Sequence, residues 1–506
     1  MTRRSLSTLA CAALLFLAAS TTQADVRLPA LFSEHMVLQR DATAPVWGWA
    51  EAGEQVTVTV ADQSQTAQAD ATGKWLVKLA NLKAGGPHTL TVKGKNTITV
   101  DDVLIGEVWL GSGQSNMAMS VSRAKNFADE QAAAKLPQIR MFTVTTTAAD
   151  APQDDCVGTW SVCTPETVGR FSATLFFFGR EIHKTVKVPV GLINSSVGGT
   201  PIESWVSAEA QYASAELKPL IDSIKAEQDK FDPVAAQAKF DKDLARWKER
   251  AQQAKAEGKA APVAPRNPVA TRKVKGNIGG LFNGKIAPLV PYGIRGVVWY
   301  QGEANTNDVK SPYYQYHLPL LVNDWRARWG SELPFAWVQL PNYNRNDGWC
   351  VVREAMLKTL RLPKTGMAIT IDVGDPKDIH PANKQDVGKR LALWALGTVY
   401  GEKVATSGPL PGETVFRDRD AVITFTHTDG GLQALGGGEL KGFVIAGDDK
   451  QWKPAKARIE GNTVIVSHPD GVKPTAVRYA WLGNPECNLY NGAGLPASPF
   501  RTDHAK

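Results

Sequence analysis

Long apolar runs are scarce in this chain, and their scarcity excludes a protein built from membrane-spanning helices. Beyond the first residues, no apolar run reaches the roughly 20 residues that such a helix needs. The first 24 residues differ, because Arg3 and Arg4 precede an apolar core and a small-residue exit ending at Ala24. This order is typical of a secretory signal. We therefore expect residues 1–24 to be a signal peptide and the chain to be exported, to a periplasm or out of the cell.

Cysteine is also scarce, with five in 506 residues. Cys11 falls within the signal, and the other four have no spacing typical of a zinc site, so we expect no metal. An exported chain meets an oxidising compartment, which permits disulfides. We expect a local Cys156–Cys163 bridge and a Cys350–Cys487 bridge that joins the middle of the chain to its C-terminal region. The alternative is four free buried thiols.

The chain also lacks a strong net charge that is spread evenly along its length. The formal net charge is +7, and the segment 225–275 alone carries thirteen Lys and Arg against seven Asp and Glu. The positive charge is therefore concentrated in one insertion. A solvated helical face explains such a segment, and we expect no nucleic-acid partner.

Two flanking regions have the pattern of β-structure. In residues 25–102, segments 56–60 and 89–92 alternate polar and apolar side chains with a period of two, which predicts a small β-sandwich. In residues 403–506, short apolar segments separated by Gly, Asp and Pro predict a second β-rich domain.

Between these regions, residues 103–402 alternate strands and helices, as parallel β-α-β units do. The predicted strands and helices are, in chain order, 103–110, 170–186, 188–194, 294–300, 312–329, 335–340, 367–372 and 381–400. An interruption at 207–275 is rich in Ala, Lys, Glu and Gln, which favour helices. We expect a helical insertion there, either a lid over the active site or a peripheral addition.

The stretch 103–117, VLIGEVWLGSGQSNM, organises this central domain. Its apolar part predicts a buried strand that stops at Gly111-Ser112-Gly113. Ser115 then lies at the carboxyl end of a parallel strand, where α/β proteins place ligands. A serine at that point is either a nucleophile or a helix N-cap.

A nucleophilic serine needs a base and an acid that orients the base. His380 lies in a loop between a predicted strand and a predicted helix, where it could face Ser115. Asp378 is two residues earlier, so its carboxylate and the imidazole can point to the same side of an extended loop. Asp375 and Asp372 compete for this role, and Asp378 could instead cap the helix.

Hydrogen-bond donors for an oxyanion follow the neighbouring strands. The candidates are the backbone N–H of Gly199, with Gly198 as the alternative, the side-chain amide of Gln301 and the backbone N–H of Ser115. Each donor could contribute about 3 kcal/mol. The G-x-S-x-G motif of α/β-hydrolases is absent, because Met117 occupies its last position.

Four sequence blocks together carry a family resemblance: GQSNM at 113–117, GGTPIESW at 198–205, WYQGE at 299–303 and DIHP at 378–381. In this order they resemble the sialate O-acetylesterase-like family of SGNH/GDSL hydrolases. The segment LFSEHMVLQR at 31–40 also resembles the β-domain with which this family begins.

The resemblance implies an SGNH-hydrolase (flavodoxin-like) three-layer α/β/α domain with flanking β-sandwich regions. It implies Ser115 as nucleophile, His380 as base, Gly199 as oxyanion donor, and no metal or organic cofactor. Gln301 stands where many SGNH enzymes have an asparagine. The wider SGNH superfamily often spaces its acid and base as D-x-x-H, whereas Asp378-Ile-His380 is one residue shorter.

The residues around these positions complete the expected site. We expect Gln114, Asn116, Glu303 and Asn305 to bind sugar hydroxyls, although Glu303 and Asn305 could instead brace their loop. The expected activity is release of acetate from acetylated oligosaccharides through a serine acyl-enzyme, on plant hemicellulose such as xyloglucan or xylan. The alternatives are a sialate 9-O-acetylesterase and a non-catalytic carbohydrate-binding protein. The sequence gives no oligomeric state.

Overall fold

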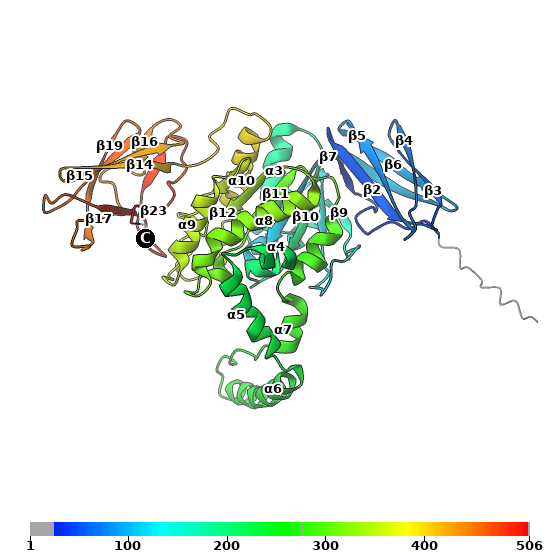
Figure 1. Cartoon of the computed structure of the whole chain (residues 1–506), viewed down its shortest axis with the longest axis horizontal. Coiled ribbons are helices and arrows are strands. Elements are labelled where there is room, and N and C mark those ends of the chain that lie inside the picture. The colour runs from blue at the N-terminus through cyan, green and yellow to red at the C-terminus, as the bar shows by residue number, and fades with distance from the viewer. Residues whose placement is uncertain (1–24, 276, 504–506) are drawn as a thin grey trace, which may run out of the picture.

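The computed structural model describes residues 25–275 and 277–503, so the expected signal peptide lies outside the described residues. Figure 1 shows an α/β body between two β regions, with a group of helices projecting from the body. No described helix is both long and apolar enough to cross a membrane. Within the same residues, no group of three or more His, Cys, Asp and Glu side chains could hold a metal ion.

A mixed sheet forms the centre of the molecule. Its parallel strands lie in the spatial order β8 (Leu136–Thr143), β10 (Val190–Ser196), β7 (Thr97–Gly113), β11 (Gly296–Tyr300), β12 (Phe335–Val338) and β13 (Thr365–Ala368). The antiparallel strand β9 (Trp160–Cys163) adds to the β8 edge. After β7 the chain forms β8 and β10 on one side of β7, and it then crosses to form β11, β12 and β13 on the other side. The carboxyl end of β7 therefore lies where the strand order reverses. Ligands bind at such points in open α/β sheets.

The strand β7 joins the central sheet to the N-terminal region. Its first part pairs with the antiparallel strand β6 (Gly85–Lys93), and its last residues pair with β10 and β11. The strand β1 (Val37–Gln39) pairs with β7 between these two parts. Every residue of β7 from Val103 onward is buried. The domain boundary expected at residue 102 therefore falls inside one continuous strand.

The N-terminal region contains the further strands β2 (Thr43–Trp49), β3 (Gln55–Val60), β4 (Gln63–Gln68) and β5 (Lys74–Ala80). In β2, β3 and β5 every second residue is buried, whereas β4 has no buried residue. Strand β3 pairs with β4 and β6, and β2 pairs with β5. In β3, Val56, Val58 and Val60 point into the core, as the period-two pattern predicted.

Helices cover both faces of the central sheet. The four longest of these are α3 (Ala173–Val186), α8 (Tyr314–Trp329), α9 (Trp349–Thr359) and α10 (Lys384–Thr398). Trp109 and Val298 belong to a buried cluster with residues of α3 and α10. Their neighbours Leu110 and Trp299 belong to the cluster that includes α8 and α9. Successive strand residues point to opposite faces, so one strand supplies both clusters.

Short helical segments lie in the connections between these elements. They are α1 (Ser115–Ala118), η1 (Val121–Arg123), α2 (Phe127–Ala132), η2 (Val168–Arg170), η3 (Ile202–Ser204), η4 (Phe282–Ile286), η5 (Ala287–Leu289), η6 (Glu303–Asn305) and η7 (Ser311–Tyr313). The expected helix 381–400 begins at Lys384, because the Asn383 side chain accepts a hydrogen bond from the Asp386 N–H and caps it. Pro381 lies in the preceding loop.

The insertion between β10 and β11 is helical, with most of it projecting from the body (Figure 1). Its helices are α4 (Ala208–Ala213), α5 (Lys218–Asp229), α6 (Pro233–Ala256) and α7 (Pro268–Lys275). No residue of α6 is buried. Its apolar stripe of Phe240, Leu244 and Trp247 is only half-buried. Trp247 Nε1 donates to the Pro262 carbonyl at 2.7 Å, so the following Pro-rich segment covers part of the stripe.

The C-terminal region has two four-stranded sheets that share one core. The first is β14 (Leu410–Arg417), β15 (Asp420–Thr426), β20 (Thr463–Ser467) and β19 (Lys456–Glu460); the second is β18 (Lys453–Pro454), β17 (Phe443–Ala446), β21 (Ala476–Tyr479) and β23 (Phe500–Arg501). A further pair is β16 (Leu432–Ala434) and β22 (Leu489–Asn491). Arg353 of α9 is buried and donates to the carbonyls of Leu482 and Gly483, which holds this region against the body.

The expected disulfides are absent: in the described residues, all four cysteines are free. The prediction of a Cys156–Cys163 bridge is wrong because the two thiols belong to different buried clusters of the α/β body. Burial raises the pKa of each of these two thiols to about 12, so both remain protonated at neutral pH. Cys350 on α9 and Cys487 in the C-terminal region are likewise unbridged.

Candidate active site

The local backbone at the end of β7 presents Ser115 at the edge of the sheet. Gly113 has a φ of +135°, and a Cβ there would lie 2.1 Å from the Tyr300 carbonyl oxygen, so only glycine fits. The Gln114 N–H donates to that same oxygen at 2.9 Å. Ser115 then begins α1 and is partly exposed. A buried strand thus ends in an accessible hydroxyl at the point where the strand order reverses.

The turn after β10 lies beside this serine. The Val197 N–H donates to the Gly113 carbonyl at 3.1 Å. A side chain on Gly198 would begin 3.5 Å from the Ser115 Cβ, so glycine leaves the space next to the hydroxyl open. Gly198 and Gly199 are exposed. Within the described chain, the backbone N–H groups of Ser115, Gly198 and Gly199 donate to no protein acceptor, so all three are free to bind an oxyanion.

Of the three candidate acids, only Asp378 faces His380. Asp378 Oδ1 lies 3.6 Å from His380 Nδ1 and accepts a hydrogen bond from the His380 backbone N–H at 2.8 Å. The ring contact is too long for a hydrogen bond. Asp375 instead accepts from the backbone of Lys377 and Asp378. The other candidate, Asp372, is paired with a neighbouring arginine.

The environment of His380 favours the neutral imidazole that a general base needs. Desolvation lowers the pKa of His380, and the positive charges of Arg123 and Lys384 lower it further, while Asp378 opposes them. The result lies below the ordinary value of about 6.5. At neutral pH the ring is therefore unprotonated and able to accept a proton.

Asn116 links the serine loop to the histidine loop. Its Nδ2 donates to the Ile379 carbonyl at 2.9 Å, so the residues next to Ser115 and His380 are bonded to each other. In the described residues, the Ser115 hydroxyl makes no hydrogen bond with the imidazole. Catalytic hydrogen bonds are often long before substrate binds, and the two loops are already adjacent.

A buried polar network, consisting of Asn116, Glu303 and Lys384, lies beneath these loops. Asn116 Nδ2 also donates to Glu303 Oε1 at 2.6 Å, and Lys384 Nζ donates to Asn116 Oδ1 and to the Pro381 carbonyl, both at 2.7 Å. Asn116 and Lys384 are fully buried, and Glu303 is 5% exposed. Burial raises the pKa of Glu303 and lowers the pKa of Lys384 to about 7.

The sequence interpretation missed Lys384 and placed Asn116 and Glu303 among the substrate-binding residues. The structure instead gives Asn116 and Glu303 interior partners. A signal for Lys384 was present, because it precedes Val387, Leu391 and Trp394 at helical spacing and so falls on the buried face of α10. A lysine on an apolar helix face needs a polar partner inside the protein.

Gln301, Gln114 and Asn305 form a second interior cluster. Gln301 Nε2 donates to Asn305 Oδ1 at 2.7 Å, to the Thr200 carbonyl at 3.1 Å and to Gln114 Oε1 at 3.3 Å. Asn305 Nδ2 donates to Glu203 Oε2 at 3.0 Å. All three members are buried. The amide hydrogens of Gln301 are thus engaged inside the protein, where they brace the end of β11.

A cavity of about 500 Å³, here called the insertion hollow, lies between the helical insertion and the turn after β10. Lys275 of α7 lines it and donates to the Gly199 carbonyl at 2.6 Å. Arg266 also lines it, and burial together with the charge of Arg266 lowers the pKa of Lys275. Lys310 is paired with Glu203 at 3.2 Å, whereas Lys275 and Arg266 have no carboxylate partner in the described chain.

Comparisons with known proteins agree with an ester-hydrolysing site. The family described as "Carbohydrate esterase, sialic acid-specific acetylesterase" matches residues 105–235 and 285–396. Sialate O-acetylesterases from Rattus norvegicus and Homo sapiens are 31% and 30% identical, over 94% of this chain and 94% and 92% of theirs. A carbohydrate acetylesterase from Xanthomonas citri is 36% identical, with a TM-score of 0.81 over 95% of this chain and 100% of that chain.

These similarities define the protein as an enzyme, a carboxylic-ester hydrolase that acts on carbohydrate acetates. The chain belongs to the sialate O-acetylesterase family, which confirms the resemblance seen in the four sequence blocks. The family match omits residues 236–284, a segment that contains most of α6 and all of α7.

Proposed function

We propose that the protein is an exported serine esterase that removes acetyl groups from oligosaccharides, built on an SGNH-type three-layer domain with flanking β-sandwiches. The observation that supports it most is the bonding of the Ser115 loop to the His380 loop through Asn116. It brings a partly exposed hydroxyl, a neutral imidazole and three unused N–H groups to one edge of the sheet.

The proposed reaction has two steps. Ser115 Oγ attacks the acetyl carbonyl carbon while His380 accepts the hydroxyl proton, and the oxyanion receives hydrogen bonds from Ser115 and from Gly199 or Gly198. The sugar oxygen then leaves with the proton from His380. In the second step, water loses a proton to His380 and attacks the acetyl-enzyme, which releases acetate and restores Ser115. Neither step uses a metal or an organic cofactor.

Two classes of sugar are candidates for the substrate. Acetylated hemicellulose, as xyloglucan or xylan oligosaccharides, is the class that the sequence interpretation favoured. A 9-O-acetylated sialic acid is the other, and the insertion hollow supports it, because Lys275 and Arg266 both line it without a carboxylate partner among the described residues, and Lys275 contacts Gly199. The family and its curated relatives carry sialate in their names, which also supports this class.

Acetate release from acetylated xyloglucan, acetylated xylan and 9-O-acetylsialic acid tests the proposal. Wild-type enzyme should hydrolyse at least one of them, and Ser115→Ala should hydrolyse none at a comparable rate. If the substrate is acidic, Lys275→Met and Arg266→Met should raise KM for the sialate ester and leave p-nitrophenyl acetate hydrolysis unchanged. Equal effects of these two substitutions on both esters would contradict the role of the insertion hollow.

A further inference from the structure

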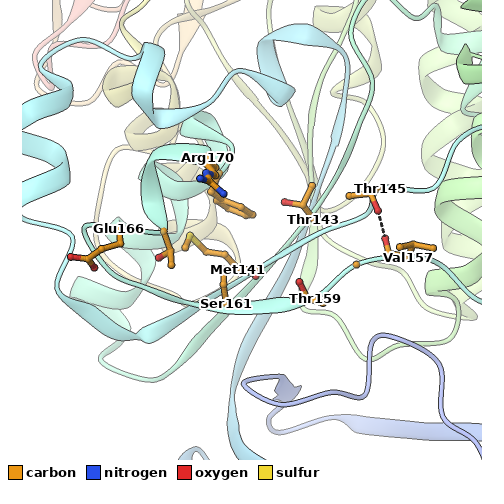
Figure 2. Close-up of a pocket in the computed structure, with 11 residues that line it drawn as sticks. Met141, Thr143, Thr145, Val157, Thr159, Ser161, Glu166 and Arg170 are labelled. Carbon is orange, nitrogen blue, oxygen red and sulfur yellow. Dashed lines mark hydrogen bonds between the residues drawn. The ribbon is translucent and has the colours of Figure 1, made fainter.

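A second cavity lies at the edge of the central sheet, on the β8 side of Ser115. This β8–β9 hollow, of about 450 Å³, is bounded by the end of β8, by the segment that leads into β9, and by η2 with the residues on either side of it. Figure 2 shows that the labelled side chains of Thr143, Thr159, Ser161 and Arg170 surround a common space. None of these residues belongs to the proposed catalytic group.

The strand geometry explains why so many hydroxyl groups meet here. Thr143 and Thr145 are two residues apart at the end of β8, and Thr159 and Ser161 are two residues apart at the start of β9. Side chains two residues apart share a face of a sheet. Since β9 pairs antiparallel with β8, the two sets lie on the same face and next to each other.

Several polar groups in the β8–β9 hollow have no partner among the described residues. Thr145 Oγ1 donates to the Val157 carbonyl at 3.1 Å, and Ser161 Oγ donates to the Met141 carbonyl at 3.2 Å. In contrast, the hydroxyls of Thr143 and Thr159 and the exposed guanidinium of Arg170 make no hydrogen bond or ion pair within the described chain. A guanidinium offers five N–H donors and a hydroxyl can both donate and accept.

The exposed side chain of Val157 adds an apolar wall, whereas Phe171, which also lines the hollow, is largely buried. Free donors and acceptors beside an apolar side chain match the two surfaces of a pyranose, whose hydroxyl groups form hydrogen bonds and whose C–H face packs on apolar groups. The β8–β9 hollow therefore has the chemistry of a sugar-binding site.

Its position relative to Ser115 fits a longer substrate. Strand β10 alone separates β8 from β7, and neighbouring strands are about 5 Å apart, so Thr143 and the end of β7 are separated by roughly 10 Å across the sheet. The segment after α1 also reaches the β8–β9 hollow, because the Val121 N–H donates to the Phe171 carbonyl at 2.9 Å.

We propose that the β8–β9 hollow is a distal subsite, which binds a pyranose residue of an oligosaccharide while another residue of it presents its acetyl group to Ser115. The inference rests on the proposed function, since it assigns a place to the remainder of that substrate. The subsite contributes to the binding of oligosaccharides and not to the chemistry of the ester.

Two variants test the subsite: Arg170→Met, and Thr143→Val combined with Thr159→Val. Hydrolysis of acetylated xylo-oligosaccharides and 9-O-acetylated sialyl-oligosaccharides is compared with that of the corresponding acetylated monosaccharides. For the oligosaccharide that the wild type uses, both variants should raise KM about tenfold, the equivalent of one lost charge-assisted hydrogen bond for Arg170→Met and of two lost neutral hydrogen bonds for the double variant. Values of kcat, and all constants for the monosaccharide and p-nitrophenyl acetate, should stay unchanged.

Arg250→Met on the exposed surface of α6 is the matched control and should change nothing. Equal losses on monosaccharide and oligosaccharide, or no loss on either, would overturn the subsite. Calorimetric titration of the wild type with the same oligosaccharides without acetyl groups tests binding independently of catalysis. Binding that Arg170→Met abolishes supports the subsite even if no acetate is released, and an absence of binding to the wild type contradicts it. Failure of the wild type to release acetate from any sugar would instead disprove the proposed function.

Discussion

The two sides of the Ser115 loop differ in how their polar groups are used. On the interior side, Asn116, Glu303 and Lys384 are almost fully buried and bonded to one another. On the outer side, Gly198 and Gly199 are exposed and their N–H groups have no protein acceptor in the described residues. In the proposed mechanism the interior groups fix the loops before substrate arrives, and the outer groups remain available for the charge that develops during reaction.

Ser115→Ala should have the largest effect, because it removes the proposed nucleophile. We expect acetate release to fall by on the order of 10³-fold or more. Circular dichroism and the unfolding midpoint should remain those of the wild type, since the hydroxyl has no hydrogen bond inside the described protein. Retained turnover in a folded Ser115→Ala enzyme would show that the outer side of the loop is not the reacting side.

Lys384→Met should have the next largest effect, acting through position. It leaves Asn116 Oδ1 and the Pro381 carbonyl without their donor, and a buried unsatisfied group costs about 1–3 kcal/mol. We expect kcat to fall by about 100-fold with little change in KM, as a 1 Å misplacement can cause. The exposed Lys389→Met on the same helix is the matched control and should behave as wild type.

The pH profile of Lys384→Met separates positioning from general damage. In the proposed mechanism activity requires neutral His380, so it should be lost as the pH falls through the pKa of that imidazole. Lys384 lowers this pKa, and its removal should move the acid limb of kcat/KM to higher pH. An acid limb at the same pH in Lys384→Met and in the wild type would mean that the charge of Lys384 does not affect the pKa of His380.

Asp378→Asn should have a moderate effect of opposite sign on the pH profile. Asp378 raises the pKa of His380, so its removal should move the acid limb to lower pH. Its carboxylate is 56% exposed and 3.6 Å from the ring, so we expect kcat to fall by only about tenfold, less than for a buried, hydrogen-bonded triad acid. Asp375→Asn is the control, and an equal loss of kcat in that variant would show that Asp375 orients His380.

Replacement of α6 (Pro233–Ala256) by a short Gly/Ser linker should have the smallest effect. None of its residues is buried, so the free energy of unfolding should change by no more than about 0.5 kcal/mol. Hydrolysis of p-nitrophenyl acetate should stay within about twofold of the wild type. A tenfold loss would show that the helix acts as a lid that contributes to the active site.

Local pattern predicted most of the elements but not all of them. Apolar strands and amphipathic helices such as β10 and α3 were found, because one element carries its own periodicity. Strand β8 and helix α9 were not found. The sequence LPQIRMFT of β8 mixes polar and apolar residues next to the edge strand β9, and the apolar positions of α9 serve both the sheet and the C-terminal region.

The site was predictable where it depended on strand ends and unpredictable where it depended on side-chain partners. Ser115, Gly199 and His380 follow or lie near strand ends, so the topology brings their loops to one edge. The interior bonding of Gln301, Asn116 and Glu303 depends on residues more than a hundred positions away, such as the Gln301–Thr200 contact. The wrong disulfide prediction has the same cause, since closeness in sequence did not place Cys156 and Cys163 in one cluster.

Covalent labelling with an alkyl fluorophosphonate tests the central claim most directly, because this reagent reacts with activated serines. The account predicts that one equivalent of reagent abolishes esterase activity and that the modified peptide carries the label on Ser115. It also predicts that His380→Ala is labelled far more slowly. Loss of activity with the label on another residue, or full activity with Ser115 completely labelled, would contradict it.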